Sequence, residues 1–96
     1  MKIEKKIPNE KENLIRLVKL AIELLIEKNL SQTIILSSYK INSVLRENFG
    51  VDIKVDKIGR VLSNIAKRNK LKLKRLSTNI PKYSLRVSKF SSLKFY

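Results

Sequence analysis

The chain lacks the residue types on which most enzymes and metal sites depend. Its 96 residues include no cysteine and no histidine. Without cysteine there are no disulfides, thiolate metal ligands or cysteine nucleophiles, and without histidine the most common general base near neutral pH is missing. We therefore expect a protein that is not an enzyme and that needs no metal or other cofactor.

Glycine is also scarce, which removes a further class of sites. Gly50 and Gly59 are the only two glycines, and they lack the spacing of a phosphate-binding loop. Acidic residues do occur in close pairs, but the pairs lie near predicted helix starts, where a carboxylate favours the helix dipole. Capping therefore explains them better than catalysis does. The pairs are Glu10 with Glu12 and Asp52 with Asp56.

The chain has no long uninterrupted hydrophobic run. Residues 1–6 lack the apolar core of a signal peptide, and the longest apolar-rich stretch is broken by charged residues. We expect a cytoplasmic protein that does not span a membrane. With 43% hydrophobic residues, the chain is long enough for one domain with one modest core.

Acids are nearly absent from the second half of the chain. Of the 22 Lys and Arg residues, 13 lie in residues 54–96, where Asp56 is the single acid. The first 53 residues nearly balance, with nine basic and seven acidic residues. Like charges repel in a compact state, and that cost is usually tolerated for a polyanionic partner. Nucleic acid is the leading candidate.

The first predicted element is a helix over residues 10–29, with Asn9 as N-cap and Glu12 completing a capping box. Apolar residues surround most of its girth, so it must be buried on more than one side. A long core helix and a helix shared with a partner subunit both explain this pattern. If the domain core covers one side, a second side remains for a homodimer interface, formed by Leu17, Leu20 and Leu24.

The middle of the chain predicts a strand and two helices. The β-branched run of residues 33–36 indicates a short strand. Ser37 or Ser38 then caps a helix that ends at Gly50. After a tight connection, a third helix begins near Val55 or Asp56 and has an apolar stripe opposite a polar one. Gly59 interrupts this helix, either because a neighbour packs closely there or as a tolerated defect.

Residues 71–87 alternate between apolar and basic or polar side chains, which predicts a β-hairpin with one apolar and one basic face. About six turn-type residues separate its strands, so we expect a protruding loop. The last eight residues carry three aromatics, and we expect this tail to fold back on the core or to dock into a protein partner. Its apolar residues are Phe90, Leu93, Phe95 and Tyr96.

This order of helix, strand, helix, helix and hairpin resembles the winged helix-turn-helix family over about residues 10–88. The resemblance rests on the helix from Ser37 to Gly50, the helix from Asp56 to Asn69 with its Ile58-Gly59-Arg60-Val61-Leu62 segment, and the Leu71-to-Val87 hairpin. The Lys- and Ile-rich composition is also similar to that of small regulators from archaea and their viruses. The resemblance implies an α+β fold, with an N-terminal extension at residues 1–9 and a tail at residues 89–96.

By this resemblance, the third helix enters the major groove of DNA and the hairpin wing touches the adjacent backbone or minor groove. Lys57, Arg60, Asn64 and Lys67 would then face bases and phosphates, with Lys82 on the wing. Their chemistry agrees, because Arg and Asn suit guanine and adenine edges and any cation suits phosphate. The complete predicted DNA-binding set is Lys57, Arg60, Asn64, Lys67, Arg68, Lys72, Lys74, Arg75, Lys82 and Arg86.

We therefore predict a nucleoid-associated protein that binds double-stranded DNA and regulates transcription. Two alternatives stay open. One is a chromatin or replication-associated DNA binder with little sequence preference. The other is a structural RNA-binding subunit of a ribonucleoprotein such as the ribosome.

Overall fold

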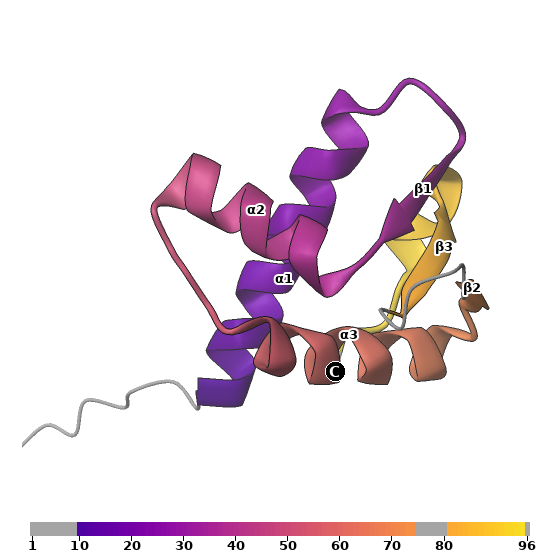
Figure 1. The fold of residues 1–96 in the computed structure, drawn as a ribbon. Helices are drawn as coiled ribbons and strands as arrows, with labels where there is room; N and C mark the ends of the chain where they lie inside the picture. The colour runs from indigo at the N-terminus through magenta and orange to yellow at the C-terminus, as the bar shows by residue number, and fades with distance from the viewer. Residues whose placement is uncertain (1–9, 75–80, 96) are drawn as a thin grey trace, which may run out of the picture.

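The computed structural model of the chain describes residues 10–74 and 81–95. These residues form an α+β fold in which helices pack against a small antiparallel sheet (Figure 1). The predicted N-terminal extension and most of the hairpin loop lie outside the described residues. The elements are α1 (Glu10–Lys28), β1 (Thr33–Leu36), α2 (Ser38–Phe49), α3 (Val55–Asn69), β2 (Lys72–Lys74), β3 (Lys82–Arg86) and the 3-10 helix η1 (Val87–Ser92).

Helix α2 begins and ends where its capping residues predict. The Ser37 side chain accepts a hydrogen bond from the Lys40 backbone N–H at 3.2 Å, which satisfies one of the free donors of the first turn. Gly50 adopts a left-handed conformation with φ of 66° and donates its N–H to the Arg46 carbonyl. Both helix limits are therefore set by local chemistry.

The connection between α2 and α3 is fixed by one asparagine. Asn42 donates from Nδ2 to Asp52 Oδ1 at 3.2 Å, and its Oδ1 accepts the Ile53 backbone N–H at 3.1 Å. The expectation that Asp52 caps the following helix is therefore wrong, because its carboxylate binds α2 instead. The N-cap of α3 is Lys54, which makes no side-chain capping bond, while Asp56 does lie in the first turn.

The sheet has the strand order β1-β3-β2, with both pairs antiparallel. Tyr83 lies between Leu36 and Leu73 in the register, and Leu85 pairs with Ile34. Leu85 is fully buried, whereas Arg86, the next residue on the strand, is exposed. For Leu85 and Arg86 of β3, the predicted apolar and basic faces of the hairpin are therefore confirmed. The strand ends one residue early, because Val87 begins η1.

The core lies where the three α-helices of the described chain meet the apolar face of the sheet. Burying a side chain such as Leu or Ile stabilises the fold by about 1.5–3 kcal/mol relative to leaving it in water. Side chains that are almost completely buried come from all three helices and from two strands. They are Val18, Ile22, Leu36, Ile41, Leu45, Ile58, Leu62, Ile65 and Leu85.

Helix α1 shows how much of its apolar girth the domain itself covers. Val18, Ala21 and Ile22 are buried as expected. Leu17 is partly buried and also packs against the core. Leu20 is 37% exposed and lies outside the core, and Leu24 is half-buried without belonging to it. No helix of the described chain is long and apolar enough to cross a membrane.

The C-terminal segment folds back onto α1 and α3 (Figure 1). The Phe95 ring is 6% exposed, packs edge-on against Phe90 at 6.0 Å between centroids, and lies under the Lys19 ammonium at 5.4 Å. Leu93 also packs against the core. Of the two alternatives for the tail, folding back is therefore what the structure shows for Phe90, Leu93 and Phe95, and Tyr96 lies outside the described residues.

Candidate nucleic-acid interface

Helix α3 divides into an inward and an outward side. Ile58, Val61, Leu62 and Ile65 point into the core and are at most 5% exposed. At about 100° per residue, the positions opposite them form the outward side. The exposed polar side chains there are Asp56, Lys57, Arg60, Asn64 and Lys67.

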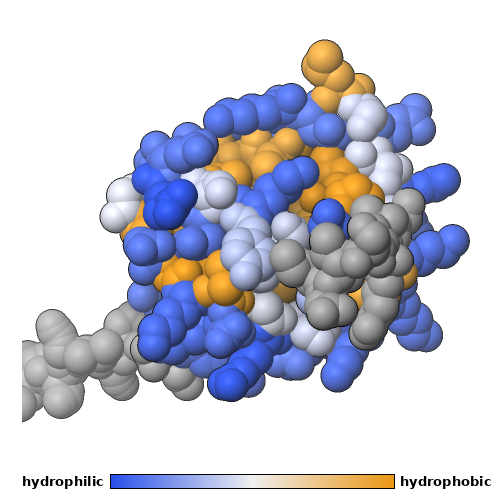
Figure 2. All heavy atoms as spheres, viewed as in Figure 1, coloured by the Kyte–Doolittle hydropathy of each residue, from blue (hydrophilic) through white to orange (hydrophobic). Residues whose placement is uncertain are grey.

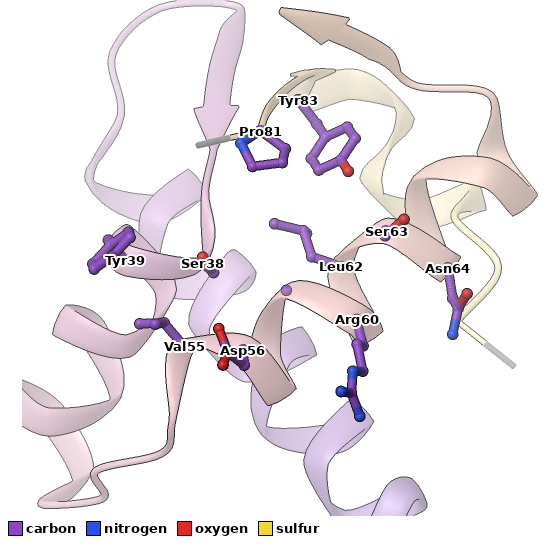
Figure 3. Close-up of a pocket in the computed structure, with 11 residues that line it drawn as sticks. Ser38, Tyr39, Val55, Asp56, Arg60, Leu62, Ser63, Asn64, Pro81 and Tyr83 are labelled. Atoms are coloured by element: carbon purple, nitrogen blue, oxygen red, sulfur yellow. The ribbon is translucent and has the colours of Figure 1, made fainter. Parts of the chain in front are cut away.

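A groove of about 760 Å³ runs along the outward side of α3, between the first turn of α2 and the start of β3. We call it the α3 groove. Figure 3 shows Tyr39 on one side of it and Tyr83 on the other, with Leu62 between them and Arg60 extending away from both tyrosines. Its lining includes Ser38, Tyr39, Gly59, Arg60, Ser63 and Tyr83.

The α3 groove continues toward the C-terminal end of α3 as a second hollow of about 430 Å³. Lys67 and Lys70 supply its basic part, and Leu73 and Tyr83 supply an apolar wall. Lys82 precedes Tyr83 on β3, so its side chain lies on the opposite sheet face, the face of Arg86. The structure thus brings Arg60 and Lys67, but not Lys82, to these two hollows. Hydrophilic side chains also project along the edge where α3 runs (Figure 2).

The side-chain donors of Arg60 and Asn64 are unengaged within the part of the chain that the structure describes. Among the described residues, no hydrogen bond or ion pair engages either side chain. Other Asn residues are engaged: Asn48 Nδ2, for example, donates to the Val44 carbonyl at 2.9 Å. Unengaged donors on an exposed helix are available to a partner, because binding it would break no internal hydrogen bond.

Arg68 does not belong to this outward group. Its Nη1 donates to the Phe95 carbonyl oxygen at 3.1 Å. The neighbouring Asn69 donates from Nδ2 to the Lys94 carbonyl at 2.8 Å and accepts the Lys94 N–H at 2.8 Å. Arg68 is exposed, but part of its guanidinium holds the C-terminal segment, so its contact with DNA stays a prediction. Local spacing could not reveal this bond, because the partner lies 27 residues away.

The remaining predicted residues lie elsewhere. Lys57 is exposed near α1, where it lines a separate groove that also reaches Arg60 and Asn64. Lys72 pairs with Ser84 and Arg86 with Thr33, so both lie on the sheet face opposite Leu85. Arg86 is at the end of β3 away from the α3 groove. Only the backbone position of Lys74, opposite Lys82, is described, and Arg75 lies outside the described residues.

Of the residues that line the α3 groove, only Arg60 and Asn64 belong to the predicted DNA-binding set. Ser63 lies three positions after Arg60, so helical spacing alone could have found it. Ser38 and Tyr39 come from α2 and reach the groove only because α2 packs across α3. Tyr39 is 54% exposed, so much of its ring is open to solvent.

Asp56 places one negative charge in an otherwise basic neighbourhood. It lines the α3 groove at the first turn of α3. A carboxylate repels phosphate but can accept a hydrogen bond from the amino group of cytosine. This end of the groove is therefore less favourable for a phosphate group than the basic end near Lys67 and Lys70. No group of three or more acidic, His or Cys side chains in the described chain could hold a metal ion.

Gly59 lies on the same outward side. A glycine within a helix costs about 1 kcal/mol relative to alanine. A Cβ built at this position would have Ser38 Cβ as its nearest neighbour, at 3.9 Å, which is an ordinary van der Waals distance. Close packing of α2 against α3 therefore does not require the glycine.

Comparison with protein-family models, with curated proteins and with solved structures gives no match for this chain. Its α+β architecture and the chemistry of the α3 groove are therefore the basis for a functional conclusion.

Proposed function

We propose that the protein is a winged helix-turn-helix DNA-binding protein that regulates transcription by occupying duplex DNA. The order and pairing of its elements support this fold, with α2 and α3 as the helix-turn-helix and the β2–β3 hairpin as the wing. The observation that carries the function is the outward side of α3. There Arg60 and Asn64 offer unengaged donors in the half of the chain that holds most of the positive charge.

The mechanism follows from the chemistry of these side chains. Arg60 presents a planar fork that suits the O6 and N7 acceptors of guanine, and Asn64 suits the N6 and N7 groups of adenine. They are four residues apart and thus neighbours on one helix face, about 5–6 Å between Cβ atoms, close enough to read nearby base pairs. Lys67 and Lys82 supply charge for the phosphates on either side, which positions α3 without reading sequence.

A competition assay tests this proposal. Genomic DNA fragments, a random-sequence duplex and total RNA compete for the protein at one fixed salt concentration. A transcription regulator should prefer particular genomic fragments over the random duplex by a large factor. Equal affinity for all duplexes would favour a chromatin-like binder instead. Preference for folded RNA would move the protein to the ribonucleoprotein class.

Pairing of two copies through α1 is part of the same proposal. Leu20 and Leu24 lie outside the core, between Arg16 toward one end of α1 and Glu27 toward the other. An antiparallel two-fold pairing would bring Arg16 of one copy near Glu27 of the other. Such a dimer would present two α3 helices to successive major grooves and would favour a roughly palindromic site.

Sedimentation equilibrium tests the pairing. The wild type should have the mass of a dimer, and the double variant Leu20→Glu, Leu24→Glu the mass of a monomer. Charge reversal of Arg16→Glu should weaken the dimer, and adding Glu27→Arg should restore it. A wild type that stays monomeric at high concentration would exclude this pairing.

A further inference from the structure

The separate groove beside Lys57 has a volume of about 570 Å³ and is formed by the first half of α1, the α2–α3 connection and α3. We call it the α1–α3 groove. Small-molecule sites in proteins are commonly hollows of about 300–1,000 Å³ that combine an apolar lining with a few polar groups. This groove has that size and an apolar lining drawn from all three segments. The apolar side chains, each buried or half-buried, are Leu14, Leu17, Ile53 and Val61.

Positive charge surrounds this apolar lining. Four basic side chains and one acidic side chain line the α1–α3 groove, so its charge favours an anion over a cation. The acid is Asp52, whose Oδ1 already accepts a hydrogen bond from Asn42. An apolar lining beside a surplus of positive charge is complementary to a molecule that has an apolar part and a carboxylate. The basic side chains are Lys11, Lys54, Lys57 and Arg60.

Arg60 is the side chain best suited to fix a carboxylate in this groove. Its guanidinium is exposed and engages no other described residue. A planar guanidinium can bind both oxygens of a carboxylate at once, which a lysine ammonium does not do. Figure 3 shows Arg60 extending away from the tyrosines of the α3 groove, and the same side chain lines the α1–α3 groove next to Val61.

We propose that the α1–α3 groove binds a small amphipathic carboxylate, with its apolar part against Leu14 and Leu17 and its carboxylate on Arg60. Arg60 and Asn64 line both grooves, so a bound carboxylate occupies donors that the proposed function gives to DNA. The molecule is therefore an effector that weakens DNA binding. Only this effector role rests on the proposed function, because binding of the carboxylate itself requires no DNA.

Isothermal titration calorimetry with octanoate, in the absence of DNA, tests the site. Octanamide keeps the chain but loses the charge, and butanoate keeps the charge but loses half of the chain. Each should bind at least about 10-fold more weakly than octanoate, because one loses a charged hydrogen bond and the other loses apolar burial. Equal affinity for octanoate and octanamide would overturn the proposal. So would the absence of saturable octanoate binding, which is the result expected if a protein segment covers the groove.

Two arginine variants locate the site. Arg60→Gln should weaken octanoate binding at least about 10-fold and leave octanamide binding unchanged. Arg46→Gln is the matched control and should bind like the wild type, since Arg46 is an exposed arginine of α2 that does not line the groove. Nuclear Overhauser contacts should join the octanoate chain to the methyl groups of Leu14 or Leu17. Equal losses in both variants, or contacts only elsewhere, would mean nonspecific attraction to a basic protein and would overturn the proposal.

The effector role is tested on a duplex selected by the wild-type protein. Saturating octanoate should weaken binding of this duplex at least about 10-fold, because it occupies the donors of Arg60, whereas octanamide at the same concentration should not. Octanoate that binds the groove but leaves duplex binding unchanged would exclude the effector role. If the protein binds no duplex at all, the proposed function fails while calorimetry still decides the carboxylate site, so the two failures are distinguishable.

Discussion

The two sides of α3 carry the same pair of residue types for different purposes. Arg60 and Asn64 on the outward side have no partner among the described residues, whereas Arg68 and Asn69 hold the backbone of Phe95 and Lys94. The difference lies in what packs against each side, namely solvent in one case and the C-terminal segment in the other. Residue type alone therefore does not distinguish an arginine that is engaged within the described chain from one that is not.

The strongest test of the outward side of α3 is how the affinity for duplex DNA depends on salt concentration. If four to eight cations contact phosphates, the logarithm of the association constant should fall with the logarithm of salt at a slope of about −4 to −7. Raising salt from about 50 to about 200 mM should then weaken binding by about 100- to 10,000-fold. Titration of a fluorescent duplex at several salt concentrations measures the slope. A slope near −1 would remove the protein from the nucleic-acid class.

The side of α3 that meets the C-terminal segment should govern the free energy of unfolding. Phe95→Ala should cost about 3 kcal/mol of unfolding free energy, because the ring is 6% exposed and its removal leaves a cavity between α1 and α3. Phe49→Ala is the matched control, since that ring is 44% exposed and its loss should cost less. Urea unfolding measures both. Equal costs would mean that the tail contributes little to the fold.

Replacing Arg60 and Arg68 by alanine, one at a time, tests whether the two arginines differ in function. Arg60→Ala should lose about 1–3 kcal/mol of binding free energy on a specific site and relax the preference at one base position. Arg68→Ala should instead lose about 1 kcal/mol of stability, through its hydrogen bond to the Phe95 carbonyl, and keep the base preference. If Arg60→Ala weakens random and specific duplexes equally, α3 does not read bases and the chromatin-like alternative holds.

The smallest effect is expected at Lys82, on the β2–β3 hairpin. Lys82→Ala should reduce the binding free energy for all duplexes by a similar amount, less than about 1 kcal/mol. The loss should not depend on sequence, because a phosphate contact carries no sequence information. The stability of the variant should change little, since Lys82 lies outside the hydrophobic core. Binding and urea curves together check this. A base-specific loss would place Lys82 against a base edge instead.

Much of the local structure could be predicted from sequence, and the reasons are local too. Ser37 and Gly50 limit α2 through hydrogen bonds that reach only a few residues. The change from helical to alternating spacing near residue 70 located the hairpin strands. Within the candidate site, the outward position of Arg60 and Asn64 followed from helical spacing alone. These features need no knowledge of what packs where.

The sequence by itself determined the limits of α2, the outward side of α3 and the surplus of positive charge. Only the tertiary structure decided that Arg68 holds the tail, that Tyr39 lines the groove and that Leu17 joins the core. Each of these depends on contacts between residues distant in the chain. Spacing within one element shows which side a residue occupies, whereas packing between elements decides what that side meets.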